Sequence, residues 1–160
     1  MTIRAAFFAA LLLAACASPA PAPAPTPPPA PAPMPEPYSQ LGRQIHADIA
    51  RLDAALREPG IVTAEIGQTA DLGGGLTVRP LAIIEDSRCP QNVQCLWAGR
   101  MRIRAMVSGI DTELTLGEGY FQSARGVVQF EVASPGAWAE WPREELGPRP
   151  AYRFGFRRGG

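Results

Sequence analysis

A run of prolines limits where a folded domain can lie in this chain. Eleven of the 18 prolines fall between Pro19 and Pro37, and most of them alternate with alanine. Proline fixes φ and lacks a backbone donor, so this run is expected to adopt polyproline II and not a helix or a sheet. We expect a semi-rigid stalk that reaches on the order of 65 Å, at about 3.1 Å per residue. The alternative interpretation is a ligand for a proline-binding module.

The residues before this run have the pattern of an export signal. Arg4 is followed by an uncharged run from Ala5 to Leu13, which is shorter than the roughly 20 apolar residues that cross a bilayer. The stretch Leu13-Ala14-Ala15-Cys16 resembles the lipobox of bacterial lipoproteins, in which the cysteine is joined to diacylglycerol before cleavage. The alternative is an ordinary signal peptide with a chance cysteine.

The lipobox resemblance implies a location as well as a modification. Residues 1–15 would be a lipoprotein signal peptide, and residues 16–37 a lipidated Cys16 followed by a Pro/Ala-rich linker. Several acyl chains of the palmitate type on one residue exceed what stable membrane attachment requires. Ala17 stands where an aspartate would, in enterobacterial-type sorting, indicate retention at the inner membrane. We therefore predict attachment to the outer membrane, facing the periplasm.

Composition bounds the part that remains. Of the 160 residues, 123 follow Pro37, which is enough for one domain with one core. The whole chain has 15 basic and 15 acidic residues, and every basic residue is an arginine. A net charge of zero argues against nucleic-acid binding. The predicted partners are the membrane, through the lipid anchor, and an envelope protein or a cell-wall glycan.

The cysteines raise the question of a metal site, a redox centre, a nucleophile or a disulfide. If Cys16 carries lipid, Cys89 and Cys95 are the only pair left, and in an oxidising compartment we expect them to be bonded. Their C-x5-C spacing differs from the C-x2-C of thioredoxin-like and zinc sites. Two thiolates cannot complete a tetrahedral zinc site, and the only histidine, His46, is distant in sequence. No metal or cofactor is predicted.

The domain is expected to start with an amphipathic helix within residues 38–59. Apolar residues recur at helical spacing, with Ser39 as a plausible N-cap and Pro59-Gly60 as the stop; they are Leu41, Ile45, Ile49, Leu52 and Leu56. Asp53 and Arg57 form an i,i+4 pair on the outer side. The helix either packs against its own domain or pairs with a second copy, and packing within the chain is favoured.

Beyond Gly60 the hydrophobic period becomes two, as in strands. Residues 100–107 show it most clearly, and Ser108-Gly109 has the length of a hairpin loop before a return strand over residues 112–116. Other expected strands are Ile61–Ile66, Leu76–Ile84 with Pro80 at an edge or bulge, an inward row of Val128, Phe130 and Val132, and an inward row of Tyr152, Phe154 and Phe156. The predicted fold class is mainly β: one small antiparallel β-sandwich or barrel-like domain over residues 60–160, preceded by the helix.

Residues 86–99 resemble a motif of uncharacterised bacterial secreted proteins and lipoproteins. The motif is D-S-R-C-P-x-x-V-x-C-x-W-A-G, and its matches here are Asp86, Ser87, Arg88, Cys89, Pro90, Val93, Cys95, Trp97, Ala98 and Gly99. In that family a strand precedes the motif and a final strand with a tyrosine closes the domain, which here would be the stretch around Tyr152. The resemblance covers about residues 66–157, leaves the helix outside, and carries no known activity.

The motif residues have the types that a stapled loop needs. Pro90 fixes φ beside the disulfide, and Trp97 offers a large apolar face to cover the sulfur atoms, as tryptophan does in immunoglobulin domains. Gly99 permits a bulge or a close approach before the arginine-rich strand. Arg88 is expected to lie across the Trp97 ring or to pair with Asp86.

Two further groups of residues have candidate binding chemistry. Arg100, Arg102 and Arg104 share one face of a strand and suit the phosphates of lipid or wall polymer; the alternative is a solvated face neutralised by Glu113. Trp138 and Trp141 suit stacking on sugar rings, whereas the alternative is that both cap the open end of the sandwich. The segment after Pro142 has the pattern of a single helical turn.

Catalysis has little support in the sequence. Glu85 and Asp86 are adjacent carboxylates, but neighbours in a strand point to opposite faces and cannot readily share one substrate. The chain has one histidine and no G-x-S-x-G motif. We predict a non-catalytic envelope lipoprotein for binding or assembly; the alternative is a glycan-binding or anion-binding module, and a hydrolase comes third.

Overall fold

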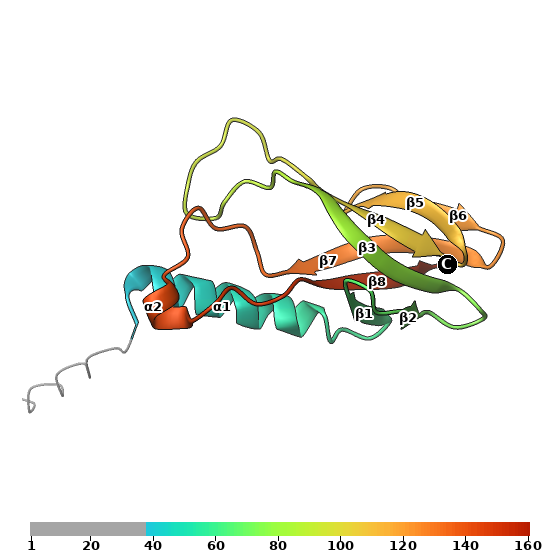
Figure 1. Ribbon diagram of the computed structural model, residues 1–160, viewed down its shortest axis with the longest axis horizontal. Helices are drawn as coiled ribbons and strands as arrows, with labels where there is room; N and C mark the ends of the chain where they lie inside the picture. Colours follow the sequence, from blue (N-terminus) through green and yellow to red (C-terminus); the bar gives the residue numbers. More distant parts are fainter. Residues whose placement is uncertain (1–37) are drawn as a thin grey trace, which may run out of the picture. The chain divides into compact units, whose positions relative to one another are not determined.

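Two four-stranded antiparallel sheets make up most of the structure (Figure 1). The computed structural model describes residues 38–160, which belong to one compact unit. The predicted signal peptide, Cys16 and the proline run lie outside the described residues. Within them, the prediction of a mainly β domain preceded by one amphipathic helix is confirmed.

The chain forms one strand of the first sheet, then all four strands of the second, and then returns to complete the first. One sheet has the order β1-β8-β7-β6, made of β1 (Ile61–Glu65), β8 (Arg153–Gly159), β7 (Gly126–Ser134) and β6 (Phe121–Ser123). The other has the order β2-β3-β4-β5, made of β2 (Ala70–Asp71), β3 (Thr77–Asp86), β4 (Met101–Val107) and β5 (Ile110–Thr115). The two helices are α1 (Gln40–Ala55) and α2 (Arg143–Leu146).

The core lies between the sheets, and β4 shows why this sequence forms a strand there. Its alternate residues Met101, Ile103, Ala105 and Val107 are all fully buried, as their period predicts. They face three phenylalanines of the other sheet, Phe130, Phe154 and Phe156. The Phe130 ring centroid on β7 lies 5.8 Å from that of Phe154 and 5.5 Å from that of Phe156 on β8. This layer of apolar side chains holds the sheets together.

One of the predicted inward rows is wrong at its last residue. Val128 and Phe130 are buried, but Val132 is only partly buried and the next core residue is Ala133. The pairing of β7 with β8 shifts register between Phe130 and Val132. A bulge of this kind adds one residue and reverses the alternation of the side chains that follow. Val132 therefore points to the outer side of its sheet.

The predicted hairpin loop after β4 and the predicted edge or bulge position of Pro80 in β3 are both confirmed. Ser108 and Gly109 join β4 to β5 with φ of 47° and 87°, the two positive angles of a type I′ hairpin. Pro80 lies beyond the two residues that β2 covers, Thr77 and Val78, and next to a register shift in the β3–β4 ladder. A residue without a backbone donor is tolerated at such a place.

Helix α1 packs against its own domain, beside β7 and β8 (Figure 1). The Ser39 hydroxyl caps it by accepting a hydrogen bond of 3.1 Å from the Gly42 amide, as predicted. Ile45 and Leu56 are buried, and the rest of the apolar stripe is partly buried. The predicted outward pair of Asp53 with Arg57 is only part of the arrangement, because Asp53 also binds Arg153 of β8.

The single helical turn expected after Pro142 is α2. It lies against the start of α1 (Figure 1), where the backbone amide and the hydroxyl of Ser39 donate to the Glu145 carboxylate at 3.2 and 2.9 Å. The same serine therefore caps one helix and fastens it to another. This contact joins segments that are 106 residues apart in sequence.

Gly155 in β8 lets the end of α1 approach the sheet. A Cβ atom at this position would lie 2.9 Å from the Cγ2 of Ile61, 3.0 Å from the Cδ2 of Leu56 and 3.1 Å from the Cβ of Val132. These are the apolar side chains of β1, of the end of α1 and of the bulge in β7. These three side chains fill the space that a side chain at position 155 would occupy.

We predict that Gly155→Ala lowers the free energy of unfolding by about 1–2 kcal/mol, because overpacking costs about 1–3 kcal/mol and the gain from replacing a strand glycine offsets part of it. Urea unfolding followed by circular dichroism measures the change. Gly160→Ala is the control, since nothing lies within 4 Å of a Cβ there. Equal stabilities of the two variants would show that Gly155 does not set the spacing.

Candidate functional site

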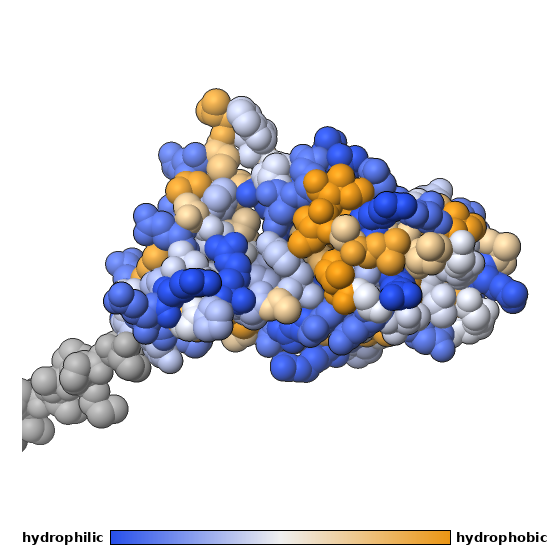
Figure 2. All heavy atoms as spheres, in the orientation of Figure 1, coloured by the Kyte–Doolittle hydropathy of each residue, from blue (hydrophilic) through white to orange (hydrophobic). Residues whose placement is uncertain are grey.

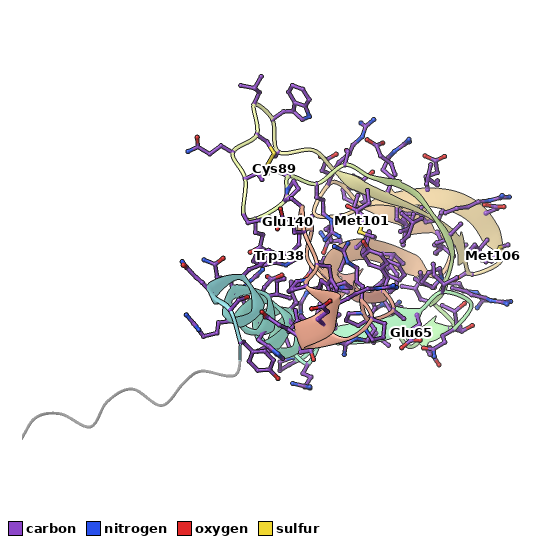
Figure 3. All side chains as sticks on the ribbon, turned by 60° about the vertical axis from the view of Figure 1, so that its left-hand side comes forward. Glu65, Cys89, Met101, Met106, Trp138 and Glu140 are labelled. Atoms are coloured by element: carbon purple, nitrogen blue, oxygen red, sulfur yellow. A yellow bond between two sulfur atoms is a disulfide. The ribbon has the colours of Figure 1, made fainter. Side chains whose placement is uncertain are left out.

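The segment between β3 and β4 forms a projecting loop closed by a disulfide (Figure 1). The Ser87 amide donates to the Arg100 carbonyl at 2.9 Å and the Cys89 amide to the Ala98 carbonyl at 2.8 Å. These bonds extend the β3–β4 ladder into the base of the loop. The predicted disulfide between Cys89 and Cys95 closes the outer part, as Figure 3 shows. We call residues 89–99 the stapled loop.

Gly99 brings the two sides of this base together. Its φ is 64°, in the left-handed region that favours glycine. A Cβ atom there would overlap the carbonyl group of Ser87. Gly99 thus permits the close approach that its place before the strand predicts, and any other residue would force the two sides apart.

A partly buried ionic cluster connects the start of the loop to β8 and β7. The Arg88 guanidinium donates to both oxygens of Asp86, at 2.7 and 2.9 Å, and to the carbonyl of Pro135 at 3.2 Å. The Tyr152 hydroxyl donates to Asp86 at 2.7 Å, and the guanidinium lies 6.0 Å from the centre of the tyrosine ring. Of the two contacts considered for Arg88, the one with Asp86 is formed.

The cluster shifts the pKa values of its members. Burial acts to raise the pKa of Asp86, but the hydrogen bonds from Arg88 and Tyr152 outweigh it and lower that pKa below its ordinary value. Burial, and then the hydrogen bond to Asp86, raise the pKa of Tyr152. Asp86 is therefore charged and Tyr152 neutral near pH 7, which is the state that their hydrogen bond requires.

We predict that Asp86→Asn lowers the free energy of unfolding at pH 7 by about 1–3 kcal/mol, because Arg88 and Tyr152 lose a charged acceptor. A carboxylate with a lowered pKa stabilises the fold above its unfolded-state pKa, and this contribution disappears as the pH falls through the folded-state pKa. The parent should therefore lose more stability than the variant between pH 7 and a pH below 3.8, the ordinary pKa of an aspartate side chain. Denaturant unfolding at a series of pH values measures both effects.

Asp111→Asn is the matched control for that experiment. Asp111 also has a lowered pKa, caused first by its hydrogen bonds from Arg104, but the pair lies open to solvent. Its replacement should change stability less than the Asp86 variant does. Parallel pH profiles for the parent and Asp86→Asn would contradict a stabilising role for the Asp86 charge.

The disulfide should contribute to stability because it closes a loop in the unfolded chain. By the chain-entropy relation, a bond across so short a segment stabilises the fold by about 2 kcal/mol. We predict that the double variant Cys89→Ser, Cys95→Ser loses about this amount in chemical unfolding. Adding a thiol reductant should destabilise the parent by a similar amount and leave the double variant unchanged. Loss in both proteins would show that the reductant acts elsewhere.

The outer end of the stapled loop presents apolar side chains to solvent. Leu96 is 95% exposed and Trp97 is 72% exposed, and Val93 is 45% exposed. Trp97 was predicted to cover the sulfur atoms, and this is wrong, because most of its surface faces water. The loop projects beyond the sheets, and apolar surface appears at its outermost point in Figure 2. We call Val93, Leu96 and Trp97 the apolar tip.

The arginine row, with Arg100 just before β4 and Arg102 and Arg104 within it, is paired with carboxylates throughout. Arg100 donates to Glu85 at 3.0 Å. Arg102 donates to Glu85 at 2.9 Å and to Glu113 at 2.7 Å, and Arg104 donates to Asp111 at 2.9 Å. This is the neutralised outer face that was the alternative to an anion site. An anion would have to compete with these ion pairs.

The carboxylates of Glu85 and Asp86 do not face a common site. Glu85 accepts from Ser87 and from two arginines on the outer face of its sheet, and these bonds, the one from Ser87 first, lower its pKa. Asp86 accepts from Arg88 and Tyr152. The two carboxylates therefore have separate partners, as their adjacent places in a strand predict.

The two tryptophans that follow β7 are held by the protein itself. Trp138 is 7% exposed and donates from Nε1 to Asp48 of α1 at 3.1 Å (Figure 3). Trp141 donates to the Gly147 carbonyl at 2.9 Å, and the Arg149 guanidinium lies 5.2 Å from its ring centre. The burial of Trp138 leaves little of its face for stacking on a sugar.

A shallow groove runs between α1 and the stapled loop. It consists of a polar hollow of about 530 Å³ beside Trp138 and a smaller, more apolar hollow of about 290 Å³ beside the disulfide. Arg51 and Gln91 line both. Asp48, 5% exposed at the floor of the polar hollow, is occupied by hydrogen bonds from Trp138 and Arg51.

Two contributions to this region were not predicted from the sequence. Asp48 follows the buried Ile45 by three residues, so helical spacing places it on the buried side of α1, and this signal was available. The exposure of Leu96 beside Trp97 had no signal in the sequence, because apolar residues next to a disulfide also suit a covered loop.

Comparisons with known proteins found no match. The chain matched no protein-family model, no curated protein and no solved structure. The resemblance at residues 86–99 therefore depends on the motif alone. Among residues 38–160, no group of three or more histidine, cysteine, aspartate or glutamate side chains is placed to hold a metal ion. The same residues include no helix long and apolar enough to span a membrane.

Proposed function

We propose that this protein is a bacterial envelope lipoprotein whose β domain serves binding or assembly and not catalysis. The observation that carries the proposal is the apolar tip on a loop that a disulfide closes. Neighbouring apolar side chains left open on a projecting loop indicate a site of interaction. The side chains with candidate catalytic chemistry, Glu85 and Asp86, are occupied by structural contacts.

The proposed anchor is a lipid on Cys16, at the periplasmic face of the outer membrane. The lipobox-like Leu13-Ala14-Ala15-Cys16 supports it, and the disulfide between Cys89 and Cys95 suits an exported protein. A proline-rich stalk of on the order of 65 Å would allow the domain to reach partners away from its attachment point. Envelope proteins, the wall and the bilayer all lie within this reach.

Site-specific photo-crosslinking in living cells tests the binding function. A photoreactive phenylalanine at Trp97 should give discrete crosslinked products. The same probe at Tyr120, which is 71% exposed against 72% for Trp97, is the matched control and should give none of them. The exposed apolar tip predicts this difference, because binding removes its surface from water. Identical products at the two positions, or no product with either protein or lipid at both, would contradict a binding role for the tip.

The same cells test the anchor through a Cys16→Ser variant and labelled fatty acid. The variant should incorporate no label, and the products at Trp97 should disappear because the domain is no longer held in the envelope. Equal labelling of the variant and the parent would contradict lipidation at Cys16. Lost labelling with unchanged products would show that the tip finds its partner without the anchor.

A further inference from the structure

The apolar tip is held in place and not merely left loose. At the base of the stapled loop, the Gln91 amide donates to the Ala137 carbonyl at 3.0 Å, and the Ala139 amide donates to the Asn92 side chain at 3.1 Å. These bonds connect the loop to the segment after β7, and the disulfide closes its outer part. The exposure of Leu96 and Trp97 is therefore a feature of the folded loop.

The stapled loop carries no charge. Residues 89–99 read CPQNVQCLWAG, so the polar groups around the tip are amides. The nearest charged side chains stand at the base, where Arg88 is paired with Asp86 and Arg100 with Glu85. Apolar surroundings penalise an unpaired charge severely, so a segment without charges can enter them at little cost.

The size of the tip separates two kinds of partner. A stable protein interface buries about 800 Å² on each side. A large aromatic side chain buries about 150–250 Å², and one such ring with two aliphatic neighbours falls well short of that area. A bilayer needs no complementary surface of this size, because any apolar group that passes the headgroups leaves water.

The order of the side chains also suits a lipid surface. Leu96, the most exposed, is purely aliphatic, and Trp97 beside it has an apolar ring with one polar N–H. Tryptophan is enriched where membrane and water meet because its ring satisfies both environments. The amide side chain of Gln94, between Val93 and Cys95, would remain at the level of the hydrated headgroups.

We infer that the apolar tip inserts into the interfacial region of a lipid bilayer and gives the domain a second, reversible membrane contact. The inference rests on the proposed anchoring in the envelope, since a tip of this size binds weakly unless the domain is held near the surface. The tip has no cationic side chain of its own, so the contact is hydrophobic and does not select anionic lipids.

The test is quenching of tryptophan fluorescence by lipids that carry bromine in their acyl chains. The processed protein is isolated from cells and reconstituted into brominated phosphatidylcholine vesicles. If it is recovered without lipid, a C-terminal His tag and a chelating lipid hold it on the same vesicles. Failure of the proposed anchor is thus detected at purification, separately from the behaviour of the tip.

The tryptophan fluorescence of the parent should be quenched. Trp97→Phe should lose this quenching, which would show that the quenched fluorescence comes from Trp97. Leu96→Asp keeps Trp97 but places a charge in the tip, and its quenching should fall to the level of Trp97→Phe. Tyr120→Asp, on an exposed aromatic residue elsewhere, should behave as the parent does. Added phosphatidylglycerol or salt should leave the parent's quenching unchanged.

Three results would overturn the inference: an unquenched parent, equal quenching of Leu96→Asp and the parent, or loss of quenching in Tyr120→Asp. A crosslink from Trp97 to one protein, together with an unquenched parent, would assign the tip to a protein partner. That outcome would keep the proposed function in binding or assembly and reject the lipid surface.

Discussion

The stapled loop depends on the hydrogen bonds that the Asp86 carboxylate accepts. They come from Arg88, two residues later, and from Tyr152, which precedes β8 by one residue and lies 66 positions away. Arg88 in turn binds the carbonyl of Pro135, just after β7. One partly buried carboxylate thus connects the end of β3, the start of the stapled loop and the neighbouring sheet. Removing one member of this cluster leaves the others without a charge-assisted hydrogen bond.

This arrangement explains how a domain of modest size can present apolar side chains to solvent. The strand core between the sheets supplies the hydrophobic stabilisation, and the disulfide, Gly99 and the Asp86 cluster define the loop. None of these contacts requires Leu96 or Trp97. The tip is therefore free of a structural task, and its composition can follow from binding.

Much of the fold follows from local signals in the sequence. The alternation in β4, the Ser108-Gly109 turn and the Ser39 cap depend on neighbouring residues, so they were predictable. The position of Val132 was not, because its bulge is set by pairing with β8. The contact of Asp86 with Tyr152 and the exposure of Trp97 likewise depend on parts of the chain that meet only in the folded state. The disulfide was predictable from cysteine arithmetic, whereas the surroundings of the loop were not.

The fastening of α1 has a mechanical consequence. Any tension that arrives through the N-terminal segment enters the domain at Ser39, which is hydrogen-bonded to Glu145 of α2. Further along, Asp48 bonds to Trp138, and Asp53 to Arg153 of β8. A pull directed along the helix would load these three connections together in shear, instead of peeling them apart one after another. The helix is thereby joined to the β domain at three separate points along its length.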